Sequence, residues 1–366
     1  MSQPLPGRHV APPDAELVVV TRRVRTAAGL VDRVENVHRG RLALLGADGA
    51  LLLRAGDVSA PLLPRSSAKP FQALGMLTAG WRPSSQQGLA LACGSHSGEP
   101  AHTDVVVAEL AAVGLTPSAL RCVADLPYGA AARQVWQAGG RVAEPLAMNC
   151  SGKHAAMLAT CVQLGWSTHD YLDPQHPLQV HLRAELGRLT ELPAPELLAR
   201  ELLAPELPAR ELLAPELPAP ELPGVATDGC GAPLFEVPLL GLALATYRLV
   251  AAVAGPELEI TAAMRANPWA VGGTGRECTR LMAGVPGLVL KEGADGVLIA
   301  GIAGAGAFVL TITDGSIPAL WPIAGALLRE LNVDDPPIDV VAPAVIGGGQ
   351  PVGSWVVTMS GLTPSR

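Results

Sequence analysis

A serine and a lysine that stand three positions apart are the first residues of this chain whose types and spacing could do chemistry. Ser66 and Lys69 lie in the sequence RSSAK at 65–69, and this spacing places two side chains on one face of a helix. A serine hydroxyl needs a neighbouring base before it becomes a nucleophile, and a lysine amine can serve when burial or a nearby positive charge lowers its pKa. The pair therefore predicts a nucleophilic hydrolase.

Two further motifs supply polar groups that such a site requires. A second lysine, Lys291, follows a predicted apolar strand in the sequence LKEG and could place another positive charge beside Lys69. The sequence CGSHSGEP at 93–100 is dense in small polar residues, and its glycines let the backbone approach a ligand closely. Ser95 is our preferred second hydroxyl in this loop, with Ser97 as the alternative.

A third group of residues combines thiols with an amine. Cys150 and Lys153 lie in the sequence NCSGKH at 149–154, and Cys230 lies in DGCG at 228–231. Two thiolates can bind Zn²⁺, although a structural zinc site takes four Cys or His ligands and a lysine must first lose its proton. The spacing alone leaves open whether this group holds a metal. In a reducing compartment all six cysteines are expected to be thiols.

The first motif needs a helix that begins close to the serine. We predict a helix over residues 69–80, because the apolar segment there ends at a glycine. Pro70 cannot donate a backbone hydrogen bond and is tolerated only in a first helical turn, which places Ser66 at the start of the helix. Backbone N–H groups are unpaired at that end, so a developing oxyanion would find donors there.

The other predicted elements place strands towards both ends of the chain and helices between them. Strands are predicted at 15–21, 288–291, 296–302 and 307–312, and a hairpin over 41–53 with a turn at 47–49. Further helices are predicted at 103–113, 153–164, 177–189 and 318–331. This order predicts an α+β fold with a sheet formed from both termini, and it argues against a doubly wound array.

Composition and charge exclude several classes of function. The chain has 366 residues, of which 49% are hydrophobic, 16% charged and 3% aromatic, and no apolar run is long enough to span a bilayer. The net charge is −7, and segment 191–223 supplies −5 of it through seven Glu and two Arg. No basic field is left to attract nucleic acid or a membrane surface. Residues 1–14 are proline-rich and lack an apolar signal segment, so we expect a cytoplasmic enzyme.

Segment 191–223 is a repeat of five-residue units such as ELLAP and ELPAP. A five-residue period matches neither the helical period nor a solenoid family, and the prolines prevent a continuous helix. We therefore predict a low-complexity insertion in a surface loop. The chain is expected to consist of a flexible tail at 1–14 and a single catalytic domain at 15–366 that carries this insertion.

Taken in order, the motifs resemble the rhizobial-type (class 3) L-asparaginase family. The matching segments are VHRG at 37–40, PRSSAK at 64–69, CGSHSGEP at 93–100, NCSGKHA at 149–155, HPLQ at 176–179, DGCGAP at 228–233 and KEGADG at 291–296. They extend over nearly the whole chain apart from the tail and the repeat. The resemblance implies hydrolysis of L-asparagine to L-aspartate and ammonia. It also implies a homodimer and a fold similar to serine β-lactamases and penicillin-binding proteins, with a mixed antiparallel sheet packed with helices.

The resemblance also implies catalytic roles. Ser66 is expected to be the nucleophile with Lys69 as its base, and Ser95 is expected to form a second, supporting pair with Lys291. The family's metal-binding trio matches Cys150, Lys153 and Cys230, with zinc favoured in a supporting rather than a catalytic role.

Other residues near these motifs are expected to contact the substrate. Asp228 lies beside the metal trio, His154 would contact the substrate or a metal-bound water, and Arg65 carries the charge that could meet the substrate α-carboxylate. A looser match at 273–278 adds Cys278. The expected substrate-binding residues are Arg65, His96, His154, Asp228 and Cys278.

Two alternatives remain at this stage. A β-lactamase-like peptidase or esterase would share the Ser-x-x-Lys spacing but would turn over β-lactams or D-alanyl esters. A non-catalytic module that senses metal or redox state would use the Cys–Lys–Cys group without hydrolysing amides. The five-residue repeat is not a feature of the family the motifs resemble, and this departure leaves the residues Ser66 and Lys69 of the motif unchanged.

Overall fold

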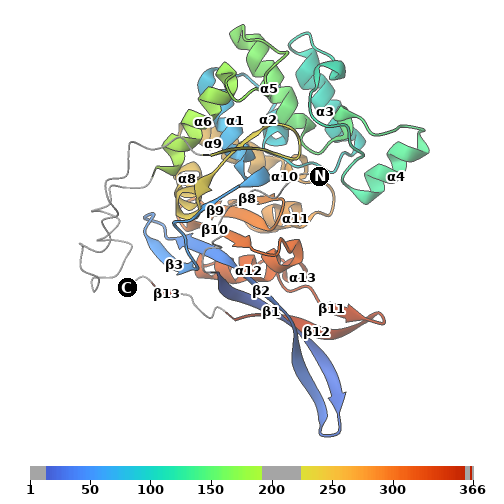
Figure 1. Cartoon of the computed structure of the whole chain (residues 1–366), viewed down its shortest axis with the longest axis vertical. Helices are drawn as coiled ribbons and strands as arrows, with labels where there is room; N and C mark the ends of the chain where they lie inside the picture. Colours follow the sequence, from blue (N-terminus) through green and yellow to red (C-terminus); the bar gives the residue numbers. More distant parts are fainter. Residues whose placement is uncertain (1–13, 192–223, 359–362, 365–366) are drawn as a thin grey trace, which may run out of the picture.

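An antiparallel sheet forms the centre of the protein (Figure 1). The structure, a computed structural model, describes residues 14–191, 224–358 and 363–364. Within these residues nine strands form the order β11-β12-β1-β2-β10-β9-β8, with β3 paired to β2 and β13 paired to β3. The strands are β1 Ala15–Thr26, β2 Gly29–Leu45, β3 Leu51–Ala55, β8 Leu288–Gly293, β9 Val297–Ile302, β10 Gly306–Ile312, β11 Val345–Gly347, β12 Gln350–Val357 and β13 Thr363–Pro364.

Strands from both ends of the chain meet in this sheet. β2 pairs with β10 through Leu42↔Leu310, and β1 pairs with β12 through Val20↔Trp355. All of the pairings are antiparallel. The predicted α+β class and the predicted origin of the sheet are confirmed, and the order of strands and helices is not that of a doubly wound fold. Two small sheets pair β4 Pro61–Leu62 with β7 Val237–Pro238 and β5 Val225–Thr227 with β6 Pro233–Phe235.

Most helices gather beyond one end of the sheet, where α1, α2, α3, α5 and α6 lie together (Figure 1). The α-helices are α1 Lys69–Ala79, α2 Gln86–Ala92, α3 Pro100–Ala111, α4 Ala130–Ala138, α5 Ser151–Leu164, α6 Pro177–Thr190, α8 Leu239–Ala251, α9 Gly255–Ala266, α10 Pro268–Val271, α11 Glu277–Gly284, α12 Ile317–Glu330 and α13 Ile338–Val341. Short 3₁₀ helices are η1 Arg65–Ala68, η2 Pro117–Ala119 and η3 Pro145–Ala147. The predicted helices at 69–80, 103–113, 153–164, 177–189 and 318–331 are confirmed as α1, α3, α5, α6 and α12, with ends that differ by a few residues.

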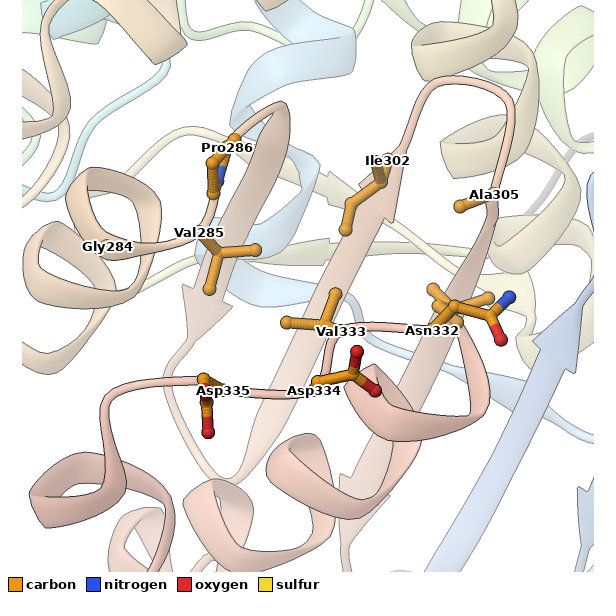
Figure 2. Close-up of a pocket in the computed structure, with 10 residues that line it drawn as sticks. Gly284, Val285, Pro286, Ile302, Ala305, Asn332, Val333, Asp334 and Asp335 are labelled. Carbon is orange, nitrogen blue, oxygen red and sulfur yellow. The ribbon is translucent and has the colours of Figure 1, made fainter.

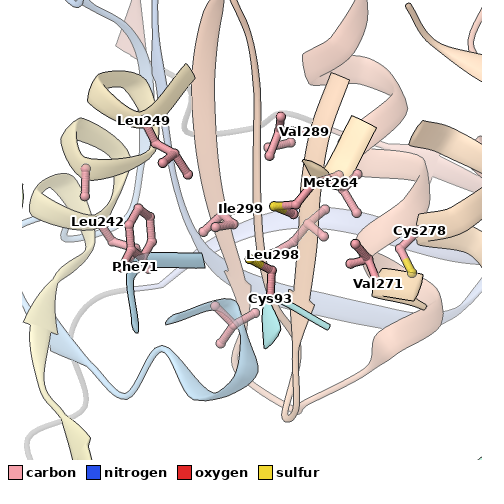
Figure 3. Packing of buried hydrophobic residues seen from close by; sticks show 14 of the residues in the cluster. Phe71, Cys93, Leu242, Leu249, Met264, Val271, Cys278, Val289, Leu298 and Ile299 are labelled. Atoms are coloured by element: carbon pink, nitrogen blue, oxygen red, sulfur yellow. The ribbon is translucent and has the colours of Figure 1, made fainter. Parts of the chain in front are cut away.

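The core lies between the sheet and the helices that cover it. Helices α8 and α12 both contact β10, and the residues of β8 are buried along the whole strand. A strand that is buried at successive positions has both of its faces covered. Figure 3 shows this packing, in which Phe71 and Leu242 approach Ile299 of β9. Lys291, which follows the apolar residues of β8, is therefore buried away from water.

Local sequence signals fix the two helices that carry the main motifs. Pro70 occupies the first turn of α1, and Gly80 follows its end with a φ of 123°. Helix α5 starts directly after Cys150 and ends at Gly165, whose φ of 69° suits a left-handed C-cap. Ser66 does not belong to α1 itself but to η1, because the chain makes one tighter turn before the α-helix begins.

Several elements were not predicted from the sequence. The hairpin of β1 and β2 extends from the body as a long ribbon (Figure 1), with Leu30 and Val34 exposed on it. Helices α8 and α9 were also missed. No single helix of the described chain is long and apolar enough to cross a membrane, although the bent pair α8 and α9 passes that test jointly. The predicted tail at 1–14 and repeat at 191–223 fall outside the described residues except for Asp14 and Glu191 and stay predictions.

Candidate active site

Ser66 lies in the turn that leads into α1. The side chain of Ser66 is partly exposed, and its hydroxyl makes no hydrogen bond with any described residue. Its neighbour Ser67 is buried, and the Ser67 hydroxyl donates to the Pro64 carbonyl over 2.6 Å. Of the two adjacent serines, Ser66 is therefore the one whose oxygen is free to meet a substrate.

Lys69 is buried at the first residue of α1, with 1% of its surface exposed. Its amine donates to the Gly94 carbonyl over 2.5 Å and to Ser95 Oγ over 2.9 Å. No described hydrogen bond joins Lys69 to Ser66, so the predicted base is held against the second hydroxyl. The structure thus brings Lys69 and Ser95 together, and the predicted pairing of Ser66 with Lys69 stays a prediction.

The alternative hydroxyl of the same loop has a different partner. Ser97 is buried and donates to the Gly272 carbonyl over 3.0 Å. His96 is fully buried, its Nε2 lies 2.9 Å from Ser151 Oγ, and its ring stacks on His102. Burial lowers the pKa of His96 well below its usual value, which keeps the ring neutral. Of the two hydroxyls that the sequence left open, Ser95 is the one in contact with a lysine.

Lys291 is fully buried within a group of charges. Its amine donates to the Glu292 carbonyl over 2.5 Å and lies 3.6 Å from Glu292 Oε1. The same carboxylate oxygen accepts from Arg276 over 2.5 Å. Burial lowers the pKa of Lys291, and the charge of Lys69 lowers it further, although Glu292 opposes this. Lys291 makes no described hydrogen bond to Ser95, so that predicted pair also stays a prediction.

The thiol group is assembled as the sequence suggested. Lys153 donates to Cys230 Sγ over 3.1 Å, and the two residues are buried with Cys150. The hydrogen bond with Cys150 lowers the pKa of Cys230, and the charge of Lys153 adds to this effect. The same hydrogen bond, together with burial, raises the pKa of Cys150. Cys230 is therefore the thiol that ionises more readily.

This group fits a metal only if the lysine takes part. No set of three or more His, Cys, Asp or Glu side chains in the described ranges is arranged to hold a metal ion. Burial opposes protonation of Lys153, but Cys230 and Cys150 together raise its pKa, so a metal would have to displace a proton from the amine. His154 contributes a buried Nε2 without a hydrogen bond, while its Nδ1 lies 2.9 Å from the Tyr171 hydroxyl. Thiolates are zinc ligands, but two of them fall short of a complete site, so a deprotonated Lys153 amine would have to complete the set.

Arg65 connects the serine turn to the thiol group. Its Nε donates to Asp228 Oδ1 over 3.0 Å, and its Nη1 contacts Asp295. Asp228 in turn lies beside Cys230, with 3.6 Å between Oδ2 and Sγ. The guanidinium that was expected to meet a substrate carboxylate is here engaged with two carboxylates of the protein.

Cys278 is buried beside the charged group of Lys291 and Glu292. Figure 3 shows it near Val271 in the apolar packing, and 1% of its surface is exposed. Burial raises the pKa of the Cys278 thiol, and a β-carbon on Gly272 would stand 2.5 Å from its sulfur. The expected contact of Cys278 with substrate stays a prediction, because the residue is a packed neighbour of Glu292 in this structure.

Comparison with known proteins decides the family. A model described as L-asparaginase II matches residues 31–200 and 216–356, which together make up most of the chain. The chain belongs to the L-asparaginase II family. The break in the match, between 200 and 216, falls inside the five-residue repeat. This membership supports the amidohydrolase expected from the motifs, and no curated protein sequence matches the chain.

Solved structures give weaker similarities to this L-asparaginase II family member. The native form of a protein named Mglu is 13% identical, covers 81% of this chain and 64% of its own chain, and has a TM-score of 0.37. A Bacillus glutaminase solved in 4.3 M NaCl is 15% identical, covers 80% and 89% of the two chains, and has a TM-score of 0.39. The chain thus spans about two thirds of Mglu, and scores this low support no further inference.

Two cavities in the described part of the chain lie away from the predicted site residues. Figure 2 shows the larger one, of about 460 Å³, between Val285, Ile302 and the segment 332–335. The second, of about 200 Å³, lies between Pro100, Trp136 and their neighbours. None of the predicted site residues lines either cavity. Hydrogen bonds and buried charges, and not these two cavities, are what bring the predicted site residues together.

Two charged residues of the site were missed. Arg276 and Glu292 join the lysines to Ser95, since the Arg276 guanidinium also donates to the Ser95 carbonyl over 3.4 Å. A signal for this site is present in the composition. The chain contains three lysines among its 26 basic residues, and all three are buried in this site: Lys69, Lys153 and Lys291.

Proposed function

We propose that this protein hydrolyses the side-chain amide of L-asparagine to give L-aspartate and ammonia through an acyl-enzyme on Ser66. The observation that carries the proposal is the contact of the buried Lys69 amine with the Ser95 hydroxyl. Lys69 follows Ser66 by three positions, and the Ser66 hydroxyl has no hydrogen-bond partner among the described residues. A buried amine in contact with one hydroxyl and three positions along the chain from another is suited to moving the proton of a serine nucleophile.

The proposed reaction has two steps. Ser66 Oγ attacks the amide carbonyl carbon, its proton passes to the Lys69 amine, and the carbonyl oxygen becomes an oxyanion. The carbon–nitrogen bond then breaks, and the amide nitrogen takes the proton and leaves as ammonia. Water cleaves the resulting β-aspartyl ester in the reverse sense and restores the Ser66 hydroxyl. Buried positive charge near the site, including Lys291, favours the oxyanion.

Ammonia release by the purified full chain tests this proposal. Wild type should release ammonia from L-asparagine, and Ser66→Ala should lower kcat by about 10³ or more. The control is Ser67→Ala, which alters the adjacent serine, whose hydroxyl already donates to Pro64. Ser95→Ala should cost about 10²-fold, because it removes only a supporting hydroxyl. Loss of turnover in Ser95→Ala with Ser66→Ala active would make Ser95 the nucleophile, and no ammonia from wild type would reject the function.

The preference for asparagine is part of the proposal and is tested in the same assay. One methylene distinguishes glutamine from asparagine, and such a difference is worth about 1–3 kcal/mol in a pocket. We expect kcat/KM for L-asparagine to exceed that for L-glutamine by roughly 10- to 200-fold. Turnover of a β-lactam or a D-alanyl ester without ammonia release would favour the peptidase or esterase alternative.

We also propose that Cys150, Lys153 and Cys230 bind zinc in a supporting role. A bound zinc would supply positive charge close to the substrate. Metal content after dialysis against micromolar Zn²⁺ gives the test, with about one zinc per wild-type chain and little in Cys230→Ala. Cys161→Ala is the matched control, because it removes another buried thiol of the described chain. Absence of bound zinc in wild type would reject this proposal and leave the hydrolytic one in place.

A homodimer is the last part of the proposal. Besides Val31, four apolar side chains are exposed on strands β2 and β12, and a group of exposed apolar side chains can mark a contact surface. They are Leu30, Val34, Val37 and Val356. Light scattering at micromolar concentration should give the mass of two chains, and a monomer at all concentrations would contradict it.

A further inference from the structure

Around Lys291 the positively charged side chains outnumber the negatively charged ones. Three cationic side chains, those of Lys69, Lys291 and Arg276, are grouped with one carboxylate, that of Glu292. The two lysines and Glu292 are at most 6% exposed, and the Arg276 side chain is 18% exposed. Little water is available to screen these charges, so the single carboxylate is the main local compensation for the cations.

Glu292 is placed between its partners by short contacts. Its Oε1 accepts from Arg276 over 2.5 Å and lies 3.6 Å from the Lys291 amine. Its Oε2 is buried and has no hydrogen-bond partner among the described residues. Arg276 is in turn held from two other sides, by the Ser95 carbonyl at 3.4 Å and by the ring of Tyr128, whose centroid lies 4.7 Å from the guanidinium carbon. The carboxylate therefore has a fixed position relative to Lys291 and Arg276, and Arg276 links it to the backbone of Ser95, whose hydroxyl contacts Lys69.

We propose that Glu292, fixed by Arg276, is a positioning residue that determines how the buried lysines share protons when the serine is activated. This inference rests on the proposed function, because it concerns the base in that reaction. Neither residue needs to touch the substrate. Glu292 acts through Lys291, and Arg276 acts by holding both Glu292 and the backbone of Ser95.

The charge balance explains why the carboxylate matters. With both lysines protonated the group carries a buried positive excess, which loss of one proton would relieve. Burial lowers the pKa of Lys291, the charges of Lys69 and Arg276 lower it further, and Glu292 and Cys278 raise it. Cys93 completes the groups that face this amine, and burial raises the pKa of its thiol to about 12, so it stays neutral. Removing the carboxylate must therefore favour the neutral lysine, and removing the guanidinium must disfavour it.

Two substitutions with opposite expected effects test the proposal. Glu292→Gln keeps the shape of the side chain and removes its charge, and the ascending limb of kcat/KM against pH should move to lower pH by about one unit. Arg276→Met should move the same limb to higher pH. Glu277→Gln is the matched control, because this carboxylate is exposed in the first turn of α11, next to Arg276, and its loss should leave the limb in place.

The outcomes separate this inference from the proposed function. A fall in kcat/KM at every pH without movement of the limb means that Glu292 is only structural, and movement in the opposite sense also overturns the proposal. If wild type releases no ammonia, the lysines can be titrated directly by NMR with ¹³Cε-lysine, since the chain has three lysines and Lys291→Met assigns the signal. The Lys291 signal should titrate at lower pH in Glu292→Gln than in wild type, and no difference rejects the inference. If Glu292→Gln does not fold, Arg276→Met is used instead in both measurements, the pH dependence of kcat/KM and the NMR titration of Lys291.

Discussion

Arg65 gives the sharpest test of how the serine turn is held. It is a non-glycine residue with a φ of 52°, in the left-handed region, and it stands directly before Ser66. Its ion pair with Asp228 is mostly shielded, since the two side chains are 27% and 10% exposed, whereas Asp295 is 70% exposed. The shielded pair should contribute about 1–2 kcal/mol, between the values for surface and buried pairs, and the exposed pair under ~0.5 kcal/mol. Arg65→Ala should therefore lower the free energy of unfolding by about 1–2.5 kcal/mol.

A comparison of two substitutions isolates the backbone contribution. A left-handed conformation costs an L-residue about 1–2 kcal/mol, while glycine loses about 0.5–1 kcal/mol more chain entropy than alanine on folding. Arg65→Gly should thus be more stable than Arg65→Ala by roughly 0.5–1 kcal/mol, although both lack the ion pairs. Urea unfolding followed by tryptophan fluorescence gives the values, assuming one cooperative transition.

The control for this comparison is Arg22→Ala, which removes a pair with Glu35 whose side chains are 42% and 37% exposed. We expect that substitution to cost less than about 1 kcal/mol. If Arg65→Ala is no more destabilising than Arg22→Ala, the shielded pair contributes no more than a surface pair. If Arg65→Gly is no more stable than Arg65→Ala, the positive φ is not a source of strain, and the reasoning about the turn fails.

Two further predictions concern packing and pH. A β-carbon on Gly88 would stand 1.8 Å from the buried Glu109 Oε1, so Gly88→Ala should destabilise the protein by about 1–3 kcal/mol. Gly187→Ala in α6, where a β-carbon would have no atom within 4 Å, should stabilise it by about 0.5–1 kcal/mol in the same urea unfolding measurement. Burial lowers the pKa of His102, so the folded protein keeps this ring neutral while the unfolded chain binds a proton below about pH 6.5. The neutral ring makes its full contribution to stability above that pH, and this contribution is lost as the pH falls. The free energy of unfolding should therefore fall less steeply at acid pH in His102→Gln, and the exposed His169→Gln is the control. An unchanged slope in His102→Gln would contradict the assignment.

Helices and strands whose own sequence has a clear local pattern could be predicted. Those that form because of tertiary contacts could not. The ends of α1 and α5 follow from proline and glycine, which act through the local backbone. Helix α8 is buried on nearly all sides, so it shows no apolar stripe from which a helix could be recognised. The outer half of β2, with Asp32 and Glu35, is exposed and lacks an alternating buried face. It is a strand because it pairs with β1.

The site shows the same division. The motifs identified the chemically active residues, because each motif is a short segment. They could not show which side chains meet, since Lys69 and Ser95 are 26 positions apart and Lys153 and Cys230 are 77 apart. Those contacts depend on how α1, α5 and the loops pack. The assignment of Lys69 to Ser66 came from helical spacing and from the family resemblance. In the structure the Lys69 amine donates to Ser95, and the pairing with Ser66 stays a prediction.

The distribution of lysine and arginine adds a last argument for the chemistry of this site. Arginine stays protonated at all relevant pH values, whereas a buried lysine can lose its proton and then act as a base or a ligand. This chain has three lysines among 26 basic residues, and each is at most 1% exposed. Arginine thus supplies every surface cation among the described basic residues, and lysine occurs only where the fold removes water from an amine. An amine that served only as a charge could be replaced by arginine at these positions, and one that exchanges a proton could not. Replacing the lysines by arginine should therefore abolish activity even where the positive charge is retained.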